Sequence, residues 1–254
     1  MTRLFLIFCL MLGAKAAAEE RVIASLSQNA VSITTDFSGS EIFVYGAIER
    51  DRFPDARDDD LAVIIAVAGP SEEVIVRKKN RAFGIWVNTE QATIDSAPSF
   101  YGVATTGPLD DILSLTADFE YSITAESGIR FSAIQQGVEN PVAYRDAVVR
   151  INRDRGTYFE DIGGVEMVGR TLFQTRIQLP ANIFEGDYVA RVFLLRDGDV
   201  LDSFETGLRV RKVGLERWIY NLAHENSLIY GILSILVALL AGWGASEAFR
   251  LLRR

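Results

Sequence analysis

The sequence predicts a mainly β protein with two immunoglobulin-like β-sandwich modules, a connecting helix and one C-terminal transmembrane helix. Short runs of β-branched and aromatic residues alternate with turn residues over much of the chain. One stretch of helical periodicity separates two groups of such runs, and an uncharged apolar stretch lies near the C-terminus. The expected segments are a signal peptide (1–18), a first β-sandwich module (19–107), a helical connector (108–156), a second β-rich module (157–213), a juxtamembrane helix (214–226), a transmembrane helix (227–246) and a short cytoplasmic tail (247–254).

The composition excludes several classes of protein. The 254 residues carry a formal net charge of −8, which argues against a nucleic-acid binder because such a protein needs a concentrated basic surface. A single cysteine excludes a disulfide framework and an iron–sulfur cluster, and a single histidine leaves little room for histidine-based catalysis or metal binding. No nucleophile-elbow, P-loop or dinucleotide motif is present. We therefore predict no catalytic, cofactor-binding or metal-ligating residues and a protein that is not an enzyme.

The N-terminus has the three parts of a secretory signal peptide. Arg3 precedes an apolar run from Leu4 to Gly13, and the small residues Ala16 and Ala18 follow. The apolar run is too short to cross about 30 Å of hydrocarbon. Cleavage is expected after Ala16 or Ala18, and it removes Cys9, the only cysteine.

The C-terminal apolar stretch predicts a membrane span. No residue from Asn226 to Ser246 is charged, and this length forms about 30 Å of helix. Basic residues flank both sides, so the positive-inside rule alone leaves the orientation ambiguous. The predicted signal peptide decides it by directing the preceding chain across the membrane. We therefore expect a single-pass inner-membrane protein with its N-terminal ectodomain in the periplasm and its C-terminus in the cytoplasm.

Strand-like runs define the first expected module. The clearest runs are 31–34, 41–48, 61–68, 73–77 and 82–87, and each is bounded by Gly, Pro, Asn or Asp. A hairpin turn is expected at Lys78–Arg81, between the last two runs. Strands at this spacing favour a sandwich over a βαβ fold.

A helix and a second group of strands follow. Asn140 and Pro141 are a favourable N-cap and first helical residue, so we predict a helix from Pro141 to Arg155. Further strands are expected at 170–179 and 188–195, and Asp197-Gly-Asp predicts a hairpin turn. The segment that leads to Tyr188 resembles the tyrosine corner of immunoglobulin-like sandwiches, in which a tyrosine bonds back to upstream backbone.

Three polar features could form a ligand-binding or pH-sensing site, but the sequence favours a structural role for each. The loop from Arg50 to Asp60 mixes three arginines with its acids and lacks EF-hand spacing, which favours a self-paired loop over a calcium site. His224 could sense pH, but an isolated interfacial histidine favours a polar helix residue. The arginines of the 141–155 helix could bind an anion, but alternating Arg and Asp favour a solvated, ion-paired face.

The expected span carries the most specific interaction signal. Ser234, Ala238, Gly242 and Ser246 recur every four residues and form a ridge of small side chains on one helix face. Such ridges allow two helices to approach closely in lipid. We predict that this ridge associates either with a second copy of the chain or with a helix of a transporter.

Several segments resemble an alphaproteobacterial family of transmembrane proteins of unknown function (Alph_Pro_TM-like). They are Lys212–His224, Leu228-Ile-Tyr-Gly, Ala241-Gly-Trp, Phe37–Ile48 and Gly186-Asp-Tyr, and the similarity covers nearly the whole mature chain. The resemblance implies a Gram-negative inner-membrane protein with a periplasmic ectodomain. Because members tend to be encoded near sulfite-exporter-type permeases, it also implies a transporter partner.

The expected function is therefore non-catalytic. The leading hypothesis is an accessory or binding subunit of an integral membrane partner such as a sulfite or anion exporter, without a cofactor. The alternative is an envelope scaffold or assembly factor with no transport role. A hydrolase built on paired carboxylates ranks third, because no two of the many acids are marked as a pair.

Overall fold

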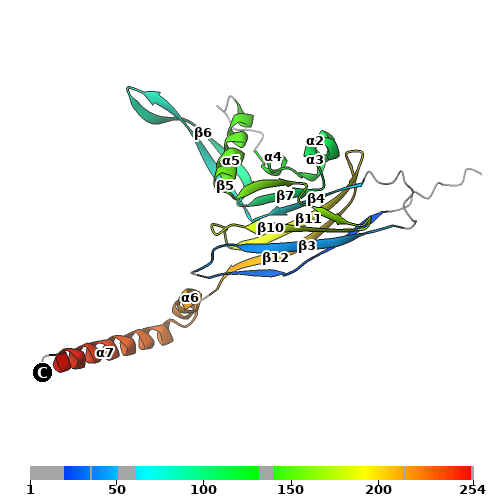
Figure 1. Ribbon diagram of the computed structural model, residues 1–254. Coiled ribbons are helices and arrows are strands. Elements are labelled where there is room, and N and C mark those ends of the chain that lie inside the picture. Colours follow the sequence, from blue (N-terminus) through cyan, green and yellow to red (C-terminus); the bar gives the residue numbers. More distant parts are fainter. Residues whose placement is uncertain (1–19, 35, 51–60, 132–139, 214, 253–254) are drawn as a thin grey trace, which may run out of the picture. The chain divides into compact units, whose positions relative to one another are not determined.

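The computed structural model describes residues 20–34, 36–50, 61–131, 140–213 and 215–252 (Figure 1). The predicted signal peptide, the acidic loop at 51–60 and residues 253–254 of the predicted tail lie outside the described residues. The chain forms two compact units. The larger, which we call the β domain, comprises the described residues from Glu20 to Val31 together with those of Ser38–Val210. The smaller, which we call the helical unit, comprises Ser32–Phe37 and the chain from Arg211 onward.

The strands form two sheets and a separate hairpin. A six-stranded sheet has the order β2–β12–β11–β4–β7–β8, and a four-stranded sheet has the order β1–β3–β10–β9. The remaining two strands, β5 and β6, form a two-stranded sheet, and Ser96 of β6 also makes an isolated bridge with Arg130. The strands are β1 (Arg21–Leu26), β2 (Ala30–Ile33), β3 (Ser40–Glu49), β4 (Leu61–Ala68), β5 (Ser71–Ala82), β6 (Ile85–Pro98), β7 (Tyr101–Thr105), β8 (Tyr158–Ile162), β9 (Glu166–Val168), β10 (Leu172–Leu179), β11 (Gly186–Arg196) and β12 (Asp199–Lys212).

A helical crossover joins β7 to β8. These two strands are parallel, so the chain between them must return to the same end of the sheet. The crossover contains α2 (Leu109–Ile112), α3 (Leu115–Tyr121), α4 (Ala125–Gly128) and α5 (Pro141–Asp154). The predicted helix at 141–155 is confirmed as α5, and its predicted N-cap is also confirmed because the Asn140 side chain accepts from the Ala143 amide.

The six-stranded sheet is buried on both faces at its centre. β4 is buried from Ala62 to Val67, as expected for a strand covered on both sides. Its residues Ala62, Ile64 and Ala66 share one core cluster with residues of α4 and α5. The intervening Val63, Ile65 and Val67 are equally buried and point to the opposite face. Figure 1 shows the helices on one side of β4, β7 and β11, and β3 and β10 on the other.

Strand pairing corrects the expectation of two separate immunoglobulin-like modules. β10, from the expected second module, pairs with β3 from the first, and β11 likewise pairs with β4. The two segments therefore build common sheets. The connector is also part of the core, because Val148 and Val149 of α5 pack in the same cluster as Ile64. Local hydrophobic patterns identify strands but do not specify their partners, which is why the sequence suggested two modules.

Two predicted turn features are confirmed and one is wrong. The Tyr188 hydroxyl donates to the Phe184 carbonyl across 2.9 Å, as expected for a tyrosine corner. Asp197 and Gly198 both have positive φ and connect β11 to β12. The turn expected at Lys78–Arg81 instead lies at Phe83–Gly84, and those four polar residues belong to β5. Their side chains are exposed, so the strand continues through them without a buried face.

The helical unit contains two helices, α6 (Leu215–Glu225) and α7 (Ser227–Leu252). α6 coincides with the expected juxtamembrane helix, and α7 extends beyond the expected span. Within this unit the Val213 amide donates to the Ile33 carbonyl across 2.9 Å.

Candidate functional site

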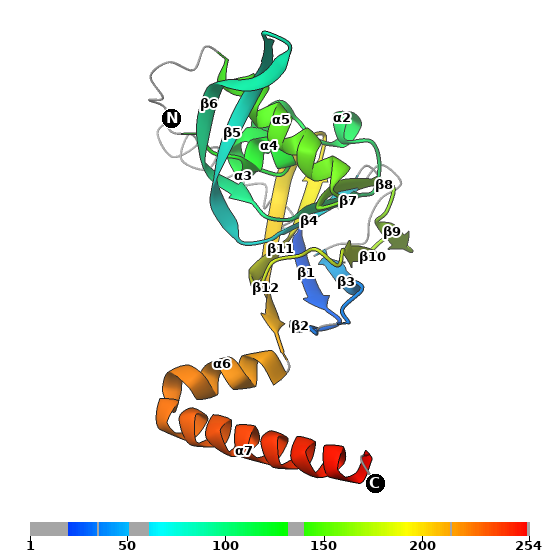
Figure 2. The same ribbon diagram turned by 90° about the vertical axis from the view of Figure 1, so that its left-hand side faces the viewer.

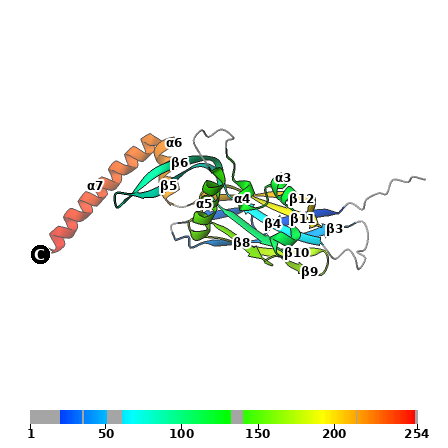
Figure 3. The same cartoon turned by 90° about the horizontal axis from the view of Figure 1, so that it is seen from above.

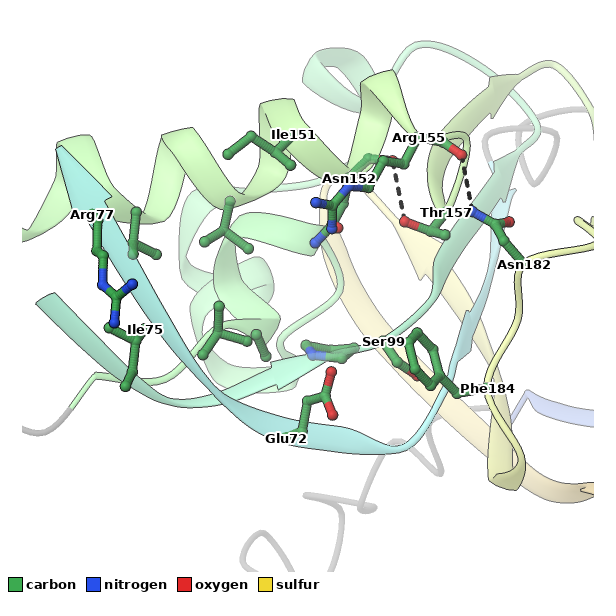
Figure 4. Close-up of a pocket in the computed structure, with 15 residues that line it drawn as sticks. Glu72, Ile75, Arg77, Ser99, Ile151, Asn152, Arg155, Thr157, Asn182 and Phe184 are labelled. Atoms are coloured by element: carbon green, nitrogen blue, oxygen red, sulfur yellow. Dashed lines mark hydrogen bonds between the residues drawn. The ribbon is translucent and has the colours of Figure 1, made fainter. Parts of the chain in front are cut away.

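A cavity of the β domain lies between α5 and the β5–β6 hairpin (Figure 4). Its volume is about 500 Å³, within the range of small-molecule sites. The lining mixes apolar and polar side chains, and the hydroxyl of the buried Thr157 donates to the Asn152 carbonyl. The lining residues are Glu72, Val74, Ile75, Val76, Arg77, Ala97, Pro98, Ser99, Val148, Ile151, Asn152, Arg155, Thr157, Asn182 and Phe184.

A second cavity, of about 470 Å³, continues the first along α5. The two cavities share Val76, Arg77 and Ile151, so they form one groove, which we call the α5 groove. The second part is strongly basic. Its charged lining residues are Arg77, Lys78, Lys79, Arg150 and Glu90.

Tyr144 and Glu90 join α5 to the hairpin in the basic part of the groove. The Tyr144 hydroxyl donates to Glu90 across 3.0 Å, and Lys78 lies 3.2 Å from the same carboxylate. The hydrogen bond from Tyr144 and, to a smaller extent, the one from Lys78 lower the pKa of Glu90. Burial, followed by the hydrogen bond to Glu90, raises the pKa of Tyr144. Glu90 is thus held as an anion that neutralises Lys78, while Arg77, Lys79 and Arg150 form no ion pair within the described residues.

The charged face of α5 makes one ion pair within the helix and others with neighbouring elements. Arg145 pairs with Asp146 at 3.3 Å, and Arg153 pairs with both Glu126 and Glu160. Arg150 lines the basic part of the groove, and Arg155, which follows the last residue of α5, lines the first cavity. The alternative expectation of an anion site on this helix therefore reduces to these two arginines and the basic residues of β5.

A buried polar network fixes α3 and α4 against the sheet, and sequence reasoning missed it. Arg191 of β11 donates to the Tyr101 hydroxyl and to the backbone carbonyls of Tyr121 and Ser122. Asp118 accepts from the amides of Ile123 and Thr124. Burial raises the pKa of Tyr101 to about 12. No sequence signal connects these residues, because they come from separate elements that only the fold brings together.

Among the described residues, no group of three or more His, Cys, Asp or Glu side chains is arranged to hold a metal ion. His224 lies in α6, where its Nδ1 is 2.9 Å from the Tyr220 carbonyl and its ring stacks on the Tyr220 ring with centroids 4.0 Å apart. This arrangement fits the preferred reading of a polar helix residue.

The four residues of the predicted ridge lie in one continuous helix. Ser234, Ala238, Gly242 and Ser246 are all exposed in α7. The Ser234 hydroxyl donates to the Tyr230 carbonyl across 2.8 Å, so its polar group is satisfied inside the helix. Open space surrounds Gly242, where an added Cβ would meet no atom within 4 Å. Nothing in the described structure tests whether this face binds another helix.

A second small-residue pattern in α7 escaped the sequence analysis. The ridge shifts around the helix by about 40° at each four-residue step. Positions spaced alternately four and three residues apart drift less around the helix, and they form the contact face of a left-handed coiled coil. This stripe is formed by Ser227, Gly231, Ser234, Ala238, Ala241, Ala245 and Ala248. It shares Ser234 and Ala238 with the ridge, so these two positions are the common candidates for helix contact.

Together these features define a class: a membrane protein with a β-rich domain and one C-terminal apolar helix. Within the described residues, Ser227–Ser246 is long and apolar enough to cross a membrane, with a mean hydropathy of 2.1 and no part of it buried. The chain belongs to the family described as "Putative transmembrane protein (Alph_Pro_TM)", which matches residues 21–251. The family resemblance noted in the sequence is thereby confirmed.

Comparison with other proteins adds no functional assignment. No curated protein matches the chain. The chain is similar to Spo0M, a sporulation control protein from Bacillus subtilis, with 13% identity and a TM-score of 0.28 over 82% of this chain and 55% of that one. It is also similar to BslA, a bacterial hydrophobin, with 10% identity and a TM-score of 0.22 over 77% of this chain and 97% of that one. The chain thus spans about half the length of Spo0M, and neither TM-score supports a common fold.

Proposed function

We propose that this protein is a non-catalytic, membrane-anchored periplasmic subunit that serves an integral membrane partner, such as a sulfite or anion exporter. A signal peptide exports the β domain, α7 spans the inner membrane, and the short C-terminal tail lies in the cytoplasm. The protein contributes binding surfaces, and its partner carries the transport.

The observation that carries this proposal is the surface of α7. None of the residues from Ser227 to Ser246 is buried. Small residues, among them Ser234, Ala238 and Gly242, alternate with bulky apolar ones on its surface. In lipid, helices associate through close packing at such small residues rather than through a hydrophobic driving force. The span therefore suits contact with another membrane helix as well as anchoring.

The α5 groove supports an anion as the transported or sensed ligand. Arg77, Lys79 and Arg150 line it without an acidic partner among the described residues. Guanidinium and ammonium groups are the usual protein ligands of oxyanions. The groove is open to solvent at its rim, so an anion could be passed to a neighbouring permease.

In-cell crosslinking followed by affinity purification in mild detergent tests the proposal. The full-length protein is compared with the variant Ala238→Leu/Gly242→Leu, in which two added side chains fill the ridge. Mass spectrometry should recover a permease with the native protein and lose it with the variant. The variant Leu236→Ile/Leu240→Ile, on the opposite face of α7, is the matched control and should retain the permease.

Recovery of only the protein itself or of soluble periplasmic proteins would contradict the proposed partner. That result would favour the second candidate, an envelope scaffold without a transport role. Leu115 and Phe119 of α3 support this alternative, because both are large apolar side chains and are 90% and 85% exposed. Exposed apolar pairs of this kind suit a protein-binding surface. Envelope defects with unchanged anion export would also favour the scaffold.

A further inference from the structure

We propose that the outer half of the β5–β6 hairpin, residues 77–88, inserts its apolar tip into the interface of an anionic lipid bilayer. We call this segment the hairpin arm. The proposal goes beyond the proposed function, because it requires no protein partner and no transported ligand. It rests on the projection, the tip, the backbone conformation and the charge of the arm.

The arm projects from the β domain. β5 and β6 contain 12 and 14 residues, and within the described chain they form a sheet of their own. The base of the hairpin is held in place, since Ile94 is fully buried and Val74 and Val76 pack against the core cluster. Beyond the base, most side chains of both strands are exposed. Figures 1 and 3 show the arm extending past the helices of this domain, and Figure 2 shows it bending over α5.

Three large apolar side chains cluster at the tip. Phe83 is completely exposed at 106%, and Ile85 and Trp86 are 64% and 68% exposed. They lie within four consecutive residues around the turn, with Ala82 opposite Ile85 and Arg81 opposite Trp86. A monomeric surface rarely leaves such a group in water, and tryptophan in particular favours the membrane–water boundary.

The turn places a phenylalanine where the backbone disfavours it. Phe83 and Gly84 have φ values of +50° and +82°, which define a two-residue turn of the I′ kind. Asn, Asp or Gly is preferred at the first position, because a bulky side chain is strained at positive φ. The equivalent position of the β11–β12 turn carries Asp197. An aromatic residue at a strained and exposed position points to a role of the tip in binding.

The charge of the arm complements an anionic surface. Residues 77–88 contain Arg77, Lys78, Lys79 and Arg81 and no acid, in a chain whose net charge is −8. Glu90 neutralises Lys78, while the other three form no ion pair within the described residues. An apolar aromatic tip with cations directly behind it matches the layers of a bilayer, in which acyl chains lie beneath anionic headgroups. A protein groove would not require this concentration of cations.

Fluorescence of a probe at the tip tests the proposal. The full chain, with Cys9→Ser and Ile85→Cys to give one labelling site, is reconstituted in nanodiscs and labelled with an environment-sensitive fluorophore. Three samples are compared: phosphatidylcholine discs alone, discs containing phosphatidylglycerol, and phosphatidylcholine discs mixed with phosphatidylglycerol vesicles. We expect a blue shift of the probe fluorescence in at least one of the two anionic samples and none with neutral lipid. A shift in the second sample indicates insertion into the membrane that holds the protein, and a shift only in the third indicates insertion into an opposing membrane.

Unlabelled variants provide the quantitative test. The measured quantity is the affinity of the hairpin arm for anionic lipid, either in vesicles added to the disc-held protein or in the disc itself. Phe83→Ser/Trp86→Ser should weaken the interaction about tenfold or more. Lys79→Gln and Arg81→Gln should each weaken it about fivefold. The matched control Leu115→Ser/Phe119→Ser removes equally exposed apolar groups from α3 and should have no effect. The proposal is overturned if no anionic lipid shifts the probe, as expected if the tip docks on a protein, or if the control loses as much binding.

Discussion

The Arg191 guanidinium donates to the Tyr101 hydroxyl across 3.0 Å, which links β11 to β7 beneath the crossover helices. The same hydroxyl lies 2.9 Å from the carbonyls of Ser122 and Ile123, at the end of α3. One buried phenol therefore connects two strands of the sheet to the helical layer. The network thereby anchors α3 and α4 on the sheet, and α4 in turn contacts α5, which lines the groove.

We expect Tyr101→Phe to destabilise the β domain by about 1–3 kcal/mol. The substitution keeps the ring but removes the acceptor of Arg191, leaving a partly buried cation with one fewer partner. Urea unfolding of the full chain in detergent measures the change. Tyr45→Phe is the control because Tyr45 is 44% exposed, and it should change stability little. Equal effects of the two variants would contradict the structural role of the network.

The stability of the protein should fall in alkaline solution. Burial raises the pKa of Tyr101 from its ordinary value of 10.0 to about 12, and it also raises the pKa values of Tyr158 and Tyr188. Between pH 10 and about pH 12, folded Tyr101 keeps a phenolic proton that the unfolded chain has lost. The free energy of unfolding therefore decreases with rising pH by about 1.4 kcal/mol per pH unit for Tyr101, and Tyr158 and Tyr188 act in the same direction. Unfolding curves from about pH 9 to about pH 12 should show this slope, and Tyr101→Phe should reduce it. A flat profile would contradict the burial of these phenols.

Gly46→Ala should destabilise the protein by about 2–3 kcal/mol. A Cβ at Gly46 of β3 would lie 2.3 Å from both the Ile23 carbonyl oxygen and the Phe173 ring. The strand or the ring must move, because β3 is held between β1 and β10. Gly207→Ala in β12 is the matched control, since its Cβ would meet nothing within 4 Å. Thermal unfolding compares the two, and a similar change in Tm for both would show that β3 packs differently.

Phe83→Asn should stabilise the hairpin by about 0.5–1 kcal/mol, because asparagine tolerates positive φ better than phenylalanine. The reciprocal change Asp197→Phe, at the equivalent position of the β11–β12 turn, should destabilise its own hairpin. Hydrogen exchange of the β5 and β6 amides measures the first effect. If Phe83→Asn instead accelerates exchange, the aromatic side chain stabilises the turn and the strain argument for its retention fails.

The sequence was most informative where local chemistry determines structure. The strand at Leu61–Ala68 was predicted at its observed bounds because a continuous apolar run between turn residues leaves little alternative. Asn140 and Pro141 likewise identified the start of α5. The apolar helix required only length and hydropathy.

Features that depend on strand partners or turn strain could not be predicted in the same way. The pairing of β3 with β10 joins segments more than a hundred residues apart, and neither strand carries a signal for the other. The turn at Phe83–Gly84 was misplaced because Lys78–Arg81 has the polarity of a turn and phenylalanine does not. The α5 groove could not be predicted either, because β5, β6 and α5 meet only in the folded protein and the sequence does not show which segments become neighbours.

The topology of the chain is the central claim of this account, and site-directed labelling of intact cells tests it most directly. In a Cys9→Ser background, single cysteines are introduced at Glu73, an exposed residue of β5, and at Arg250 near the C-terminal end of α7. A membrane-impermeant thiol reagent admitted to the periplasm should label Glu73→Cys and leave Arg250→Cys unlabelled until the inner membrane is opened. Labelling of Arg250→Cys alone, or of both sites in intact cells, would contradict a periplasmic β domain held by one span.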